Sequence, residues 1–289
     1  MKGIIRRRIA ARKRRLEKRL DKHNYPDDLS RPVIGGQNIH YEVAGSGPAL
    51  VFAHGLGGNH LSWWQQVAHF AADHTCVVFS HRGFTPSSAV PGERAPDAYA
   101  GDLAALIQEL KLEDVALVAQ SMGGWTCLEY ALRESQRVRA LVMASTSGAI
   151  DFNQLEVREL KEWANRSPGM LAELQARGFH AASGERMARE QPAAAQLYRQ
   201  IYQLTPAEFR ESVRKRIGEL RCRPPALLEQ LSMPLLFLTG EEDWVFPPAA
   251  GPALARLAPK GEAVRVPEAG HSVYFERAAQ FNELIGRML

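Results

Sequence analysis

One serine of this 289-residue chain stands in a setting that suits a nucleophile. Ser121 follows the apolar residues 114–119, which are typical of a buried parallel strand, and precedes residues 123–132, which predict a helix. A serine on a tight turn between strand and helix has its hydroxyl exposed at the sheet edge, and small neighbours let the two backbones approach closely. Ala119 and Gly123 are these neighbours, so the chain carries A-x-S-x-G where G-x-S-x-G is usual. The pattern predicts a nucleophile elbow.

A serine hydroxyl is a weak nucleophile at neutral pH and needs a base, which a histidine held by a carboxylate supplies. His271 follows a predicted strand at 262–266, and Asp243 follows another at 233–239. The order nucleophile, acid, histidine fits an elbow serine. We therefore expect Ser121 to be the nucleophile, His271 the general base and then acid, and Asp243 the group that fixes the histidine tautomer. The adjacent acids, Glu241 and Glu242, remain alternatives to Asp243.

A glycine-rich loop lies earlier in the chain, where a predicted strand at 48–53 ends in His54-Gly55-Leu56-Gly57-Gly58. Such a loop can bring a backbone N–H beside the nucleophile, so we expect the N–H groups of Leu56 and Met122 to form an oxyanion hole. His54 is expected to tie its loop rather than act as a base. All these residues lie just past the carboxyl end of a strand, where open α/β sheets place their sites.

Taken together and in order, these motifs resemble those of the α/β-hydrolase fold, in its esterase, lipase and lactonase members. The matching segments are His54-Gly55-Leu56-Gly57-Gly58, Gln120-Ser121-Met122-Gly123-Gly124, Gly240-Glu241-Glu242-Asp243 and Gly270-His271. Residues 80–87 are similar to the family's D-x-R-G-x-G-x-S loop and depart from it at Ser80, Thr85 and Pro86. The resemblance covers residues 31–289.

The resemblance implies a mostly parallel, doubly wound sheet with a helical cap. It also implies a serine hydrolase that cleaves a carboxylic ester or lactone through an acyl-enzyme, with no cofactor and no metal. A serine nucleophile argues against the relatives that open epoxides or displace halide, since those use a carboxylate. Hydrolysis of C–C bonds, thioester cleavage, perhydrolysis and acyl transfer use the same triad and stay open. So does a non-catalytic ligand receptor on this fold, which would bind tightly and turn over slowly.

The hydrophobic pattern divides the chain into three parts. Residues 31–150 and 233–289 alternate between strand and helix patterns and predict the core. Residues 151–232 show only helical periodicity, which predicts a cap that excludes water and shapes the pocket. We expect four aromatic side chains of the cap to form its own core more often than to contact substrate; they are Trp163, Phe179, Tyr198 and Tyr202. Trp63 and Trp64 could either wall the acyl pocket or pack helices.

Composition is ordinary for a soluble globular protein, with 45% hydrophobic and 24% charged residues. No apolar run is long enough to span a bilayer, no signal peptide is evident, and three cysteines without metal-site spacing indicate reduced thiols. These features predict a cytoplasmic location.

Charge is concentrated at the start of the chain. Residues 1–24 carry eleven Lys and Arg against two Asp and Glu, a net +9, which leaves −5 for the rest of a chain whose total is +4. The segment 1–30 is therefore set apart as a basic extension. The amphipathic pattern of residues 1–24 allows weak contact with an anionic membrane surface, against the alternative of a solvated extension. Nothing further along the chain indicates specific nucleic-acid binding.

Overall fold

The computed structural model describes residues 33–34, 37–88 and 94–289. The chain divides into residues 1–30 and 31–289, and all described residues belong to the second unit. The basic extension and its expected membrane contact therefore lie outside the described residues. Within the described part, no helix is both long and apolar enough to cross a membrane.

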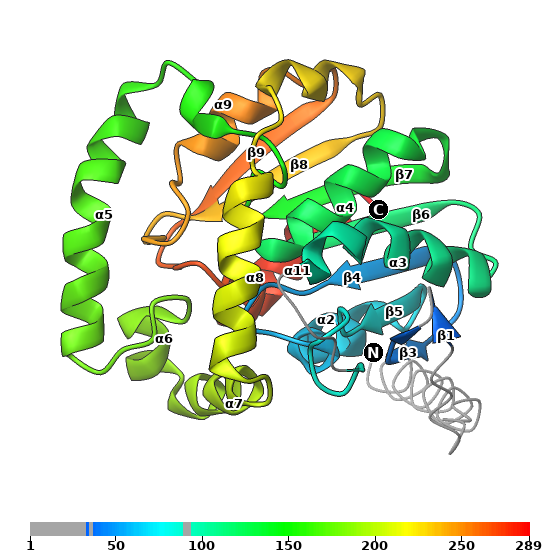
Figure 1. The fold of residues 1–289 in the computed structure, drawn as a ribbon, viewed down its shortest axis with the longest axis horizontal. Coiled ribbons are helices and arrows are strands. Elements are labelled where there is room, and N and C mark those ends of the chain that lie inside the picture. Colours follow the sequence, from blue (N-terminus) through cyan, green and yellow to red (C-terminus); the bar gives the residue numbers. More distant parts are fainter. Residues whose placement is uncertain (1–32, 35–36, 89–93) are drawn as a thin grey trace, which may run out of the picture. The chain divides into compact units, whose positions relative to one another are not determined.

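The second unit is built on a seven-stranded sheet of order β3-β5-β4-β6-β7-β8-β9 (Figure 1). The strands are β3 (Tyr41–Ala44), β4 (Ala49–Ala53), β5 (Thr75–Phe79), β6 (Val115–Gln120), β7 (Val138–Ala144), β8 (Leu235–Gly240) and β9 (Gly261–Val266). Only β3 runs antiparallel to its neighbour; every other pair is parallel. A separate antiparallel pair, β1 (Val33–Ile34) and β2 (Gln37–Asn38), precedes the sheet. The predicted fold class, a mostly parallel doubly wound sheet, is confirmed.

Helices cover both faces of this sheet, so β4, β6 and β8 are buried at every position. One face packs on α3 (Ala95–Glu109), α4 (Met122–Arg133) and α9 (Ala250–Ala255). The other packs on α2 (Trp64–Phe70), α10 (Val273–Glu276) and α11 (Ala278–Gly286). Successive strand residues alternate between these two cores, as Val51 and Phe52 do, because side chains of a strand point alternately to opposite faces.

Of the two adjacent tryptophans, Trp63 packs in the core and Trp64 lies at the surface. Trp63 is fully buried in the second core, with its ring centroid 5.1 Å from that of Phe52 and 4.5 Å from that of Tyr274. Trp64 is 49% exposed. Neither lines the cavity described below, so neither walls an acyl pocket.

Residues 151–232, all described, form a helical insertion between β7 and β8. Its α-helices are α5 (Arg158–Ala176), α6 (Gly184–Glu190), α7 (Pro192–Gln203) and α8 (Ala207–Leu220). In Figure 1 these helices lie beyond the carboxyl ends of the strands. The ends of the insertion meet in a parallel bridge between Ile150 and Arg223, where the Asp151 N–H donates to the Arg223 carbonyl at 2.9 Å.

An ion pair fastens the base of the insertion to α4. Glu129 is 1% exposed, and its two oxygens accept from Nε and Nη2 of Arg223 at 2.9 and 3.0 Å. Arg133 of the same helix reaches Glu129 at 3.4 Å but is largely exposed. A buried carboxylate requires such partners because its desolvation is costly. The insertion is thereby held to the helix that begins at Ser121.

Arg223→Met should lower the free energy of unfolding in urea by about 2 kcal/mol, because Glu129 then stays buried with one weak partner. The loss is limited because the Arg223 side chain is half exposed and its charge is partly screened by water. Arg133→Met is the matched control and should cost less than about 0.5 kcal/mol. The double variant Arg223→Met, Glu129→Met should recover part of the loss. Equal losses for both single variants would show that the pair does not anchor the insertion.

Candidate active site

Ser121 occupies a strained turn between β6 and α4. Its φ of 49° and ψ of −115° lie where residues with a side chain are uncommon. Its N–H donates to the Ala144 carbonyl at 2.9 Å, and its own carbonyl accepts from the Gly124 N–H at 2.9 Å. These bonds hold the turn that presents the hydroxyl at the sheet edge, as the elbow pattern predicts.

The small residues of the turn are there because of close backbone contacts. A Cβ on Gly123 would lie 2.2 Å from the carbonyl oxygen of Ala53, so only glycine fits. A Cβ on Gly124 would lie 2.3 Å from the Thr146 side chain. Ala119, where the family pattern has glycine, is fully buried in β6 and is accommodated. The alanine therefore leaves the elbow geometry intact.

His271 and Asp243 are joined in the structure and both are buried, at 4% and 2% exposure. The Nδ1 of His271 lies 2.9 Å from Oδ2 of Asp243. Oδ1 of Asp243 accepts the N–H groups of Val245 and Phe246, each at 2.8 Å. The carboxylate is thus held on both oxygens, and a proton on Nδ1 leaves Nε2 of His271 as an acceptor.

The neighbouring acids lie elsewhere. Glu242 is exposed and forms an ion pair with Arg186, at 2.6 Å from Nη2. Glu241 is exposed as well. Of the three consecutive acids, only Asp243 contacts the histidine. The sheet explains the meeting: β8 and β9 are neighbours with Gly240 opposite Val266, so the loops after them start side by side.

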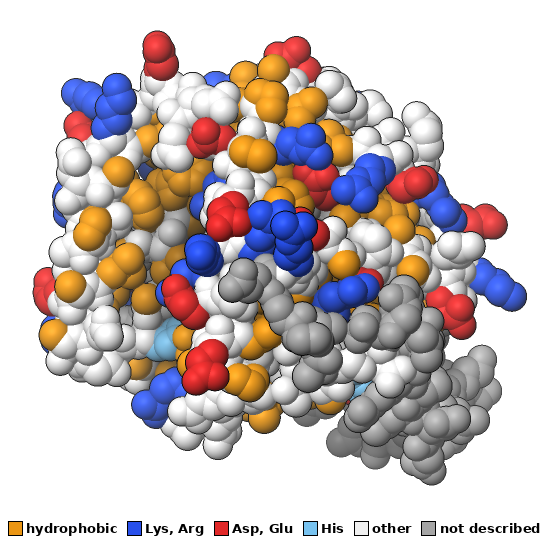
Figure 2. Space-filling model, in the orientation of Figure 1, with side chains coloured by type: hydrophobic (Ala, Val, Ile, Leu, Met, Phe, Trp, Pro, Cys, Tyr) orange, Lys and Arg blue, Asp and Glu red, His pale blue; other side chains and the backbone are white. Residues whose placement is uncertain are grey.

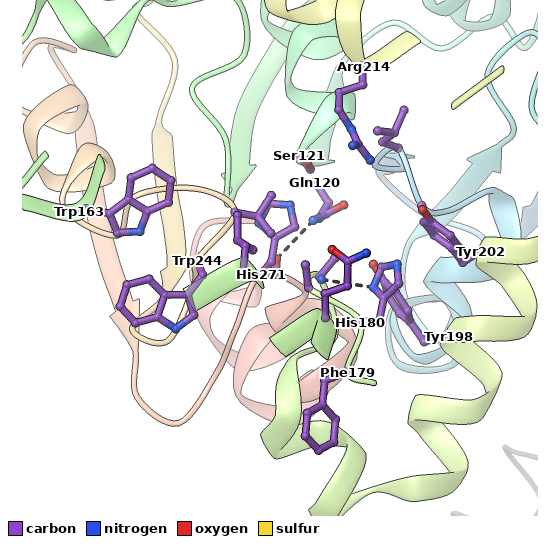
Figure 3. A pocket seen from close by; sticks show the side chains of 17 residues that line it. Gln120, Ser121, Trp163, Phe179, His180, Tyr198, Tyr202, Arg214, Trp244 and His271 are labelled. Atoms are coloured by element: carbon purple, nitrogen blue, oxygen red, sulfur yellow. Dashed lines mark hydrogen bonds between the residues drawn. The ribbon is translucent and has the colours of Figure 1, made fainter. Parts of the chain in front are cut away.

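Ser121 and His271 line one cavity. The structure shows no hydrogen bond between their side chains, although both residues are described. In ligand-free enzymes such contacts are often long and tighten when substrate binds. The amide of Gln120 donates to the His271 carbonyl at 3.3 Å and ties the two loops together (Figure 3).

The loop after β4 lies against the nucleophile. β4 pairs with β6 so that Ala53 faces Ala119, and a Cβ added to Gly55 would lie 3.1 Å from that of Ser121. Neither the Leu56 N–H nor the Met122 N–H has an acceptor within the described part of the chain. Two such donors next to a serine are what an oxyanion hole requires.

His54 has the structural role expected of it. Its Nδ1 lies 2.8 Å from the Gly55 carbonyl, and its Nε2 accepts the backbone N–H of His81 at 3.0 Å. Burial lowers the pKa of His54 to about 3, so the ring stays neutral and holds the glycine-rich loop in place.

The cavity has a volume of about 600 Å³ and lies between the sheet edge and the insertion. Figure 2 shows a hollow between α5 and α8 in which hydrophobic side chains gather. Four aromatic residues of the insertion line it, although the sequence favoured a place in the insertion's own core for them; they are Trp163, Phe179, Tyr198 and Tyr202. The reason is the arrangement of the helices around a hollow, where aromatic faces cover the wall. Tyr198 serves both purposes, since it is 5% exposed and accepts from the Ser272 hydroxyl at 3.0 Å.

Sequence reasoning missed several residues of the site. Trp244, Val245, His180 and Arg214 also line the cavity. Trp244 and Val245 directly follow Asp243, so their position in the sequence could have indicated that they lie near the site. The positions of His180 and Arg214 depend on how the insertion folds. Trp163 is further fixed by its indole N–H, which donates to the Asp243 carbonyl at 3.0 Å.

A second buried carboxylate, also missed, holds the histidine loop. Glu276 accepts the N–H of Gly270 at 2.8 Å and the N–H of Ser272 at 2.9 Å, the residues on either side of His271. Burial raises the pKa of Glu276 to about 7, against the lowering effect of these two donors. The signal available in the sequence was an acid five positions after the histidine, directly after the apolar residues 273–275.

With this geometry in view, comparison with known proteins identifies the family. A family model described as alpha/beta hydrolase fold matches residues 48–278. The chain belongs to this family. A putative non-heme bromoperoxidase of Mycobacterium tuberculosis, BpoC, is 28% identical over 257 residues, which cover 85% of this chain and 95% of that protein. The 3-oxoadipate enol-lactonase 2 of Acinetobacter baylyi is 25% identical over 240 residues, covering 82% and 87%.

Among solved structures, a thermophilic esterase from Thermogutta terrifontis matches this α/β hydrolase with a TM-score of 0.70 at 26% identity, over 90% of this chain and 95% of that one. The esterase and lactonase names of such relatives support a hydrolase.

Glu276 gives the α/β hydrolase a predictable dependence of stability on pH. The Glu276 carboxyl loses its proton near pH 4.5 in the unfolded chain but only near pH 7 in the folded protein. Folding therefore becomes less favourable as the pH rises between these two values. Glu276→Gln removes this titration. Between pH 5 and pH 8 the wild type should lose on the order of 2–3 kcal/mol more unfolding free energy than the variant. Urea titrations at both pH values measure it, and parallel losses in the two proteins would contradict the assignment.

Proposed function

We propose that this protein is a serine hydrolase that cleaves a carboxylic ester or lactone through an acyl-enzyme, without a cofactor. The observation that carries the proposal is the strained Ser121 turn sharing a cavity with a buried His271 whose Nδ1 is bonded to Asp243. Relatives named as an esterase and an enol-lactonase support the substrate class.

The proposed reaction begins when Nε2 of His271 accepts the hydroxyl proton of Ser121 and Oγ bonds to the substrate carbonyl carbon. Negative charge then develops on the carbonyl oxygen, and the N–H groups of Leu56 and Met122 stabilise it. The C–O bond to the leaving group breaks as His271 returns the proton to that oxygen. Water next attacks the acyl group by the same route, which releases the acid and restores Ser121.

Asp243 would act by keeping the Nδ1 proton of His271 in place and by stabilising the imidazolium that forms. Its two backbone donors hold the carboxylate in place in a buried setting. We propose that the helical insertion acts as a cap: its aromatic side chains wall the cavity, which limits the entry of water and positions the substrate.

A second candidate is perhydrolysis, in which hydrogen peroxide attacks the acyl-enzyme in place of water. Perhydrolysis is considered because this chain is similar, over 85% of its length, to a protein named a putative non-heme bromoperoxidase. Adding peroxide to an ester assay and measuring peracid separates the two reactions, because both share the acyl-enzyme and differ only in its acceptor.

Ser121→Ala should abolish labelling by a fluorophosphonate and reduce ester turnover by at least about 1,000-fold, because the members of a triad act as a unit. Peptide mass spectrometry of the labelled wild type should place the adduct on Ser121. Ser212→Ala, on α8 outside the cavity, is the control and should keep both labelling and turnover. Labelling that survives Ser121→Ala would remove Ser121 as the nucleophile.

Asp243→Asn should impair turnover by about 100-fold or more while the fold is kept, because an amide favours the wrong tautomer of His271. Glu242→Gln should change turnover by less than about threefold, because Glu242 pairs with Arg186 at the surface. Circular dichroism checks that both variants fold. The reverse ranking of the two variants would move the acid role to Glu242.

A further inference from the structure

The residues that line the cavity include a cationic side chain but no acidic one. Among the lining residues, all of which are described, there is one arginine, Arg214, besides His180 and His271, and no aspartate or glutamate. Figure 3 shows the Arg214 side chain reaching into the cavity from α8. A cation placed in a cleft with apolar walls favours a ligand of opposite charge.

The guanidinium of Arg214 is available to a ligand. Its ion pair joins Nη1 to Glu211 at 3.1 Å, within the same helix, and both side chains are more than half exposed. Such exposed pairs contribute little, so Glu211 is a weak competitor. Arg210, on the same helix, is already engaged, because it stacks on the Tyr202 ring at 3.8 Å and donates to the Tyr202 carbonyl at 2.8 Å.

A buried group in the cavity wall responds to the same charges. The pKa of His180 is lowered to about 4, mainly by burial and in smaller part by electrostatic repulsion from Arg210, His271 and Arg214. His180 is thus a neutral ring, held by the Ala182 N–H that donates to its Nδ1 at 3.2 Å. His180 therefore adds no charge of its own, and Arg214 is the lining side chain that carries a permanent charge.

The cavity has two chemically different sides. Figure 3 shows Trp163 and Trp244 on one side of Ser121 and His271, and Tyr202 and Arg214 on the other. We propose that the natural substrate is an ester or lactone that also carries an anionic group, in the simplest case a carboxylate, which Arg214 binds while an uncharged part contacts the tryptophans. This inference rests on the proposed function for the scissile bond and adds the anion subsite.

The test compares esters with one scissile bond in which a methyl group replaces the carboxylate. One pair is monoethyl glutarate and ethyl valerate, with the carboxylate in the acyl half. The other is O-acetylglycolate and ethyl acetate, with the carboxylate in the alcohol half. At low salt, the wild type should favour the anionic member of at least one pair in kcat/KM. Arg214→Gln should reduce that anionic-to-neutral ratio about tenfold or more, as expected for the loss of a charge-assisted hydrogen bond.

Two variants on the same helix serve as controls. Lys215→Gln removes the same charge from an exposed side chain outside the cavity and should leave the ratio unchanged. Glu211→Gln removes the competitor of Arg214 and should raise the ratio. A ratio that is the same in the wild type and in Arg214→Gln for both pairs overturns the proposal, as does an equal drop in Lys215→Gln.

A binding measurement separates the anion subsite from the hydrolase assignment. Glutarate should bind to Ser121→Ala by calorimetry, and adding Arg214→Gln should weaken that binding about tenfold or more. If glutarate binding depends on Arg214 but the wild type turns over no ester, the anion subsite is supported and the hydrolase assignment is wrong. Turnover that ignores charge would retain the hydrolase and reject the subsite.

Discussion

The site depends on the burial of one carboxylate. Asp243 is 2% exposed, and a buried anion is stable only when its oxygens are bonded. Two backbone N–H groups and the His271 ring satisfy this need, which fixes the loop after β8 and the orientation of the imidazole together. Glu276, a second buried carboxylate, accepts backbone N–H groups on both sides of His271 and so fixes the backbone of the histidine loop. The position of the His271 ring therefore follows from two buried acids.

The sheet brings these groups to one edge. β8 and β9 are neighbours and supply the acid and the histidine, while β4 and β6 are neighbours and supply the N–H groups and Ser121. β4 is also where the strand order reverses, since the chain passes from it to β5 on one side and later to β6 on the other. Open α/β sheets bind ligands at such a switch point. The helical insertion then encloses this edge and adds the aromatic wall.

Local signals were sufficient to predict the core and the placement of Ser121, His271 and Asp243, because strand ends and turn residues follow from short-range pattern. They left Glu241 and Glu242 as alternatives to Asp243; in the structure Asp243 bonds to His271, whereas Glu242 pairs with Arg186 at the surface. Helical periodicity located the insertion but not which of its faces meet the cavity, so it did not show that four of its aromatic side chains line that cavity. The Glu129–Arg223 pair spans 94 positions and leaves no local trace.

The central claim is that Ser121 carries the acyl group during turnover, and trapping that intermediate tests it most directly. An aryl carbamate is suitable because its carbamoyl-enzyme is hydrolysed slowly. After brief reaction and acid quench, mass spectrometry should show one added carbamoyl group, located on the peptide that contains Ser121, in step with one equivalent of released phenol. Release of phenol over many turnovers with no covalent mass, or a carbamoyl group on a different residue, would contradict the account.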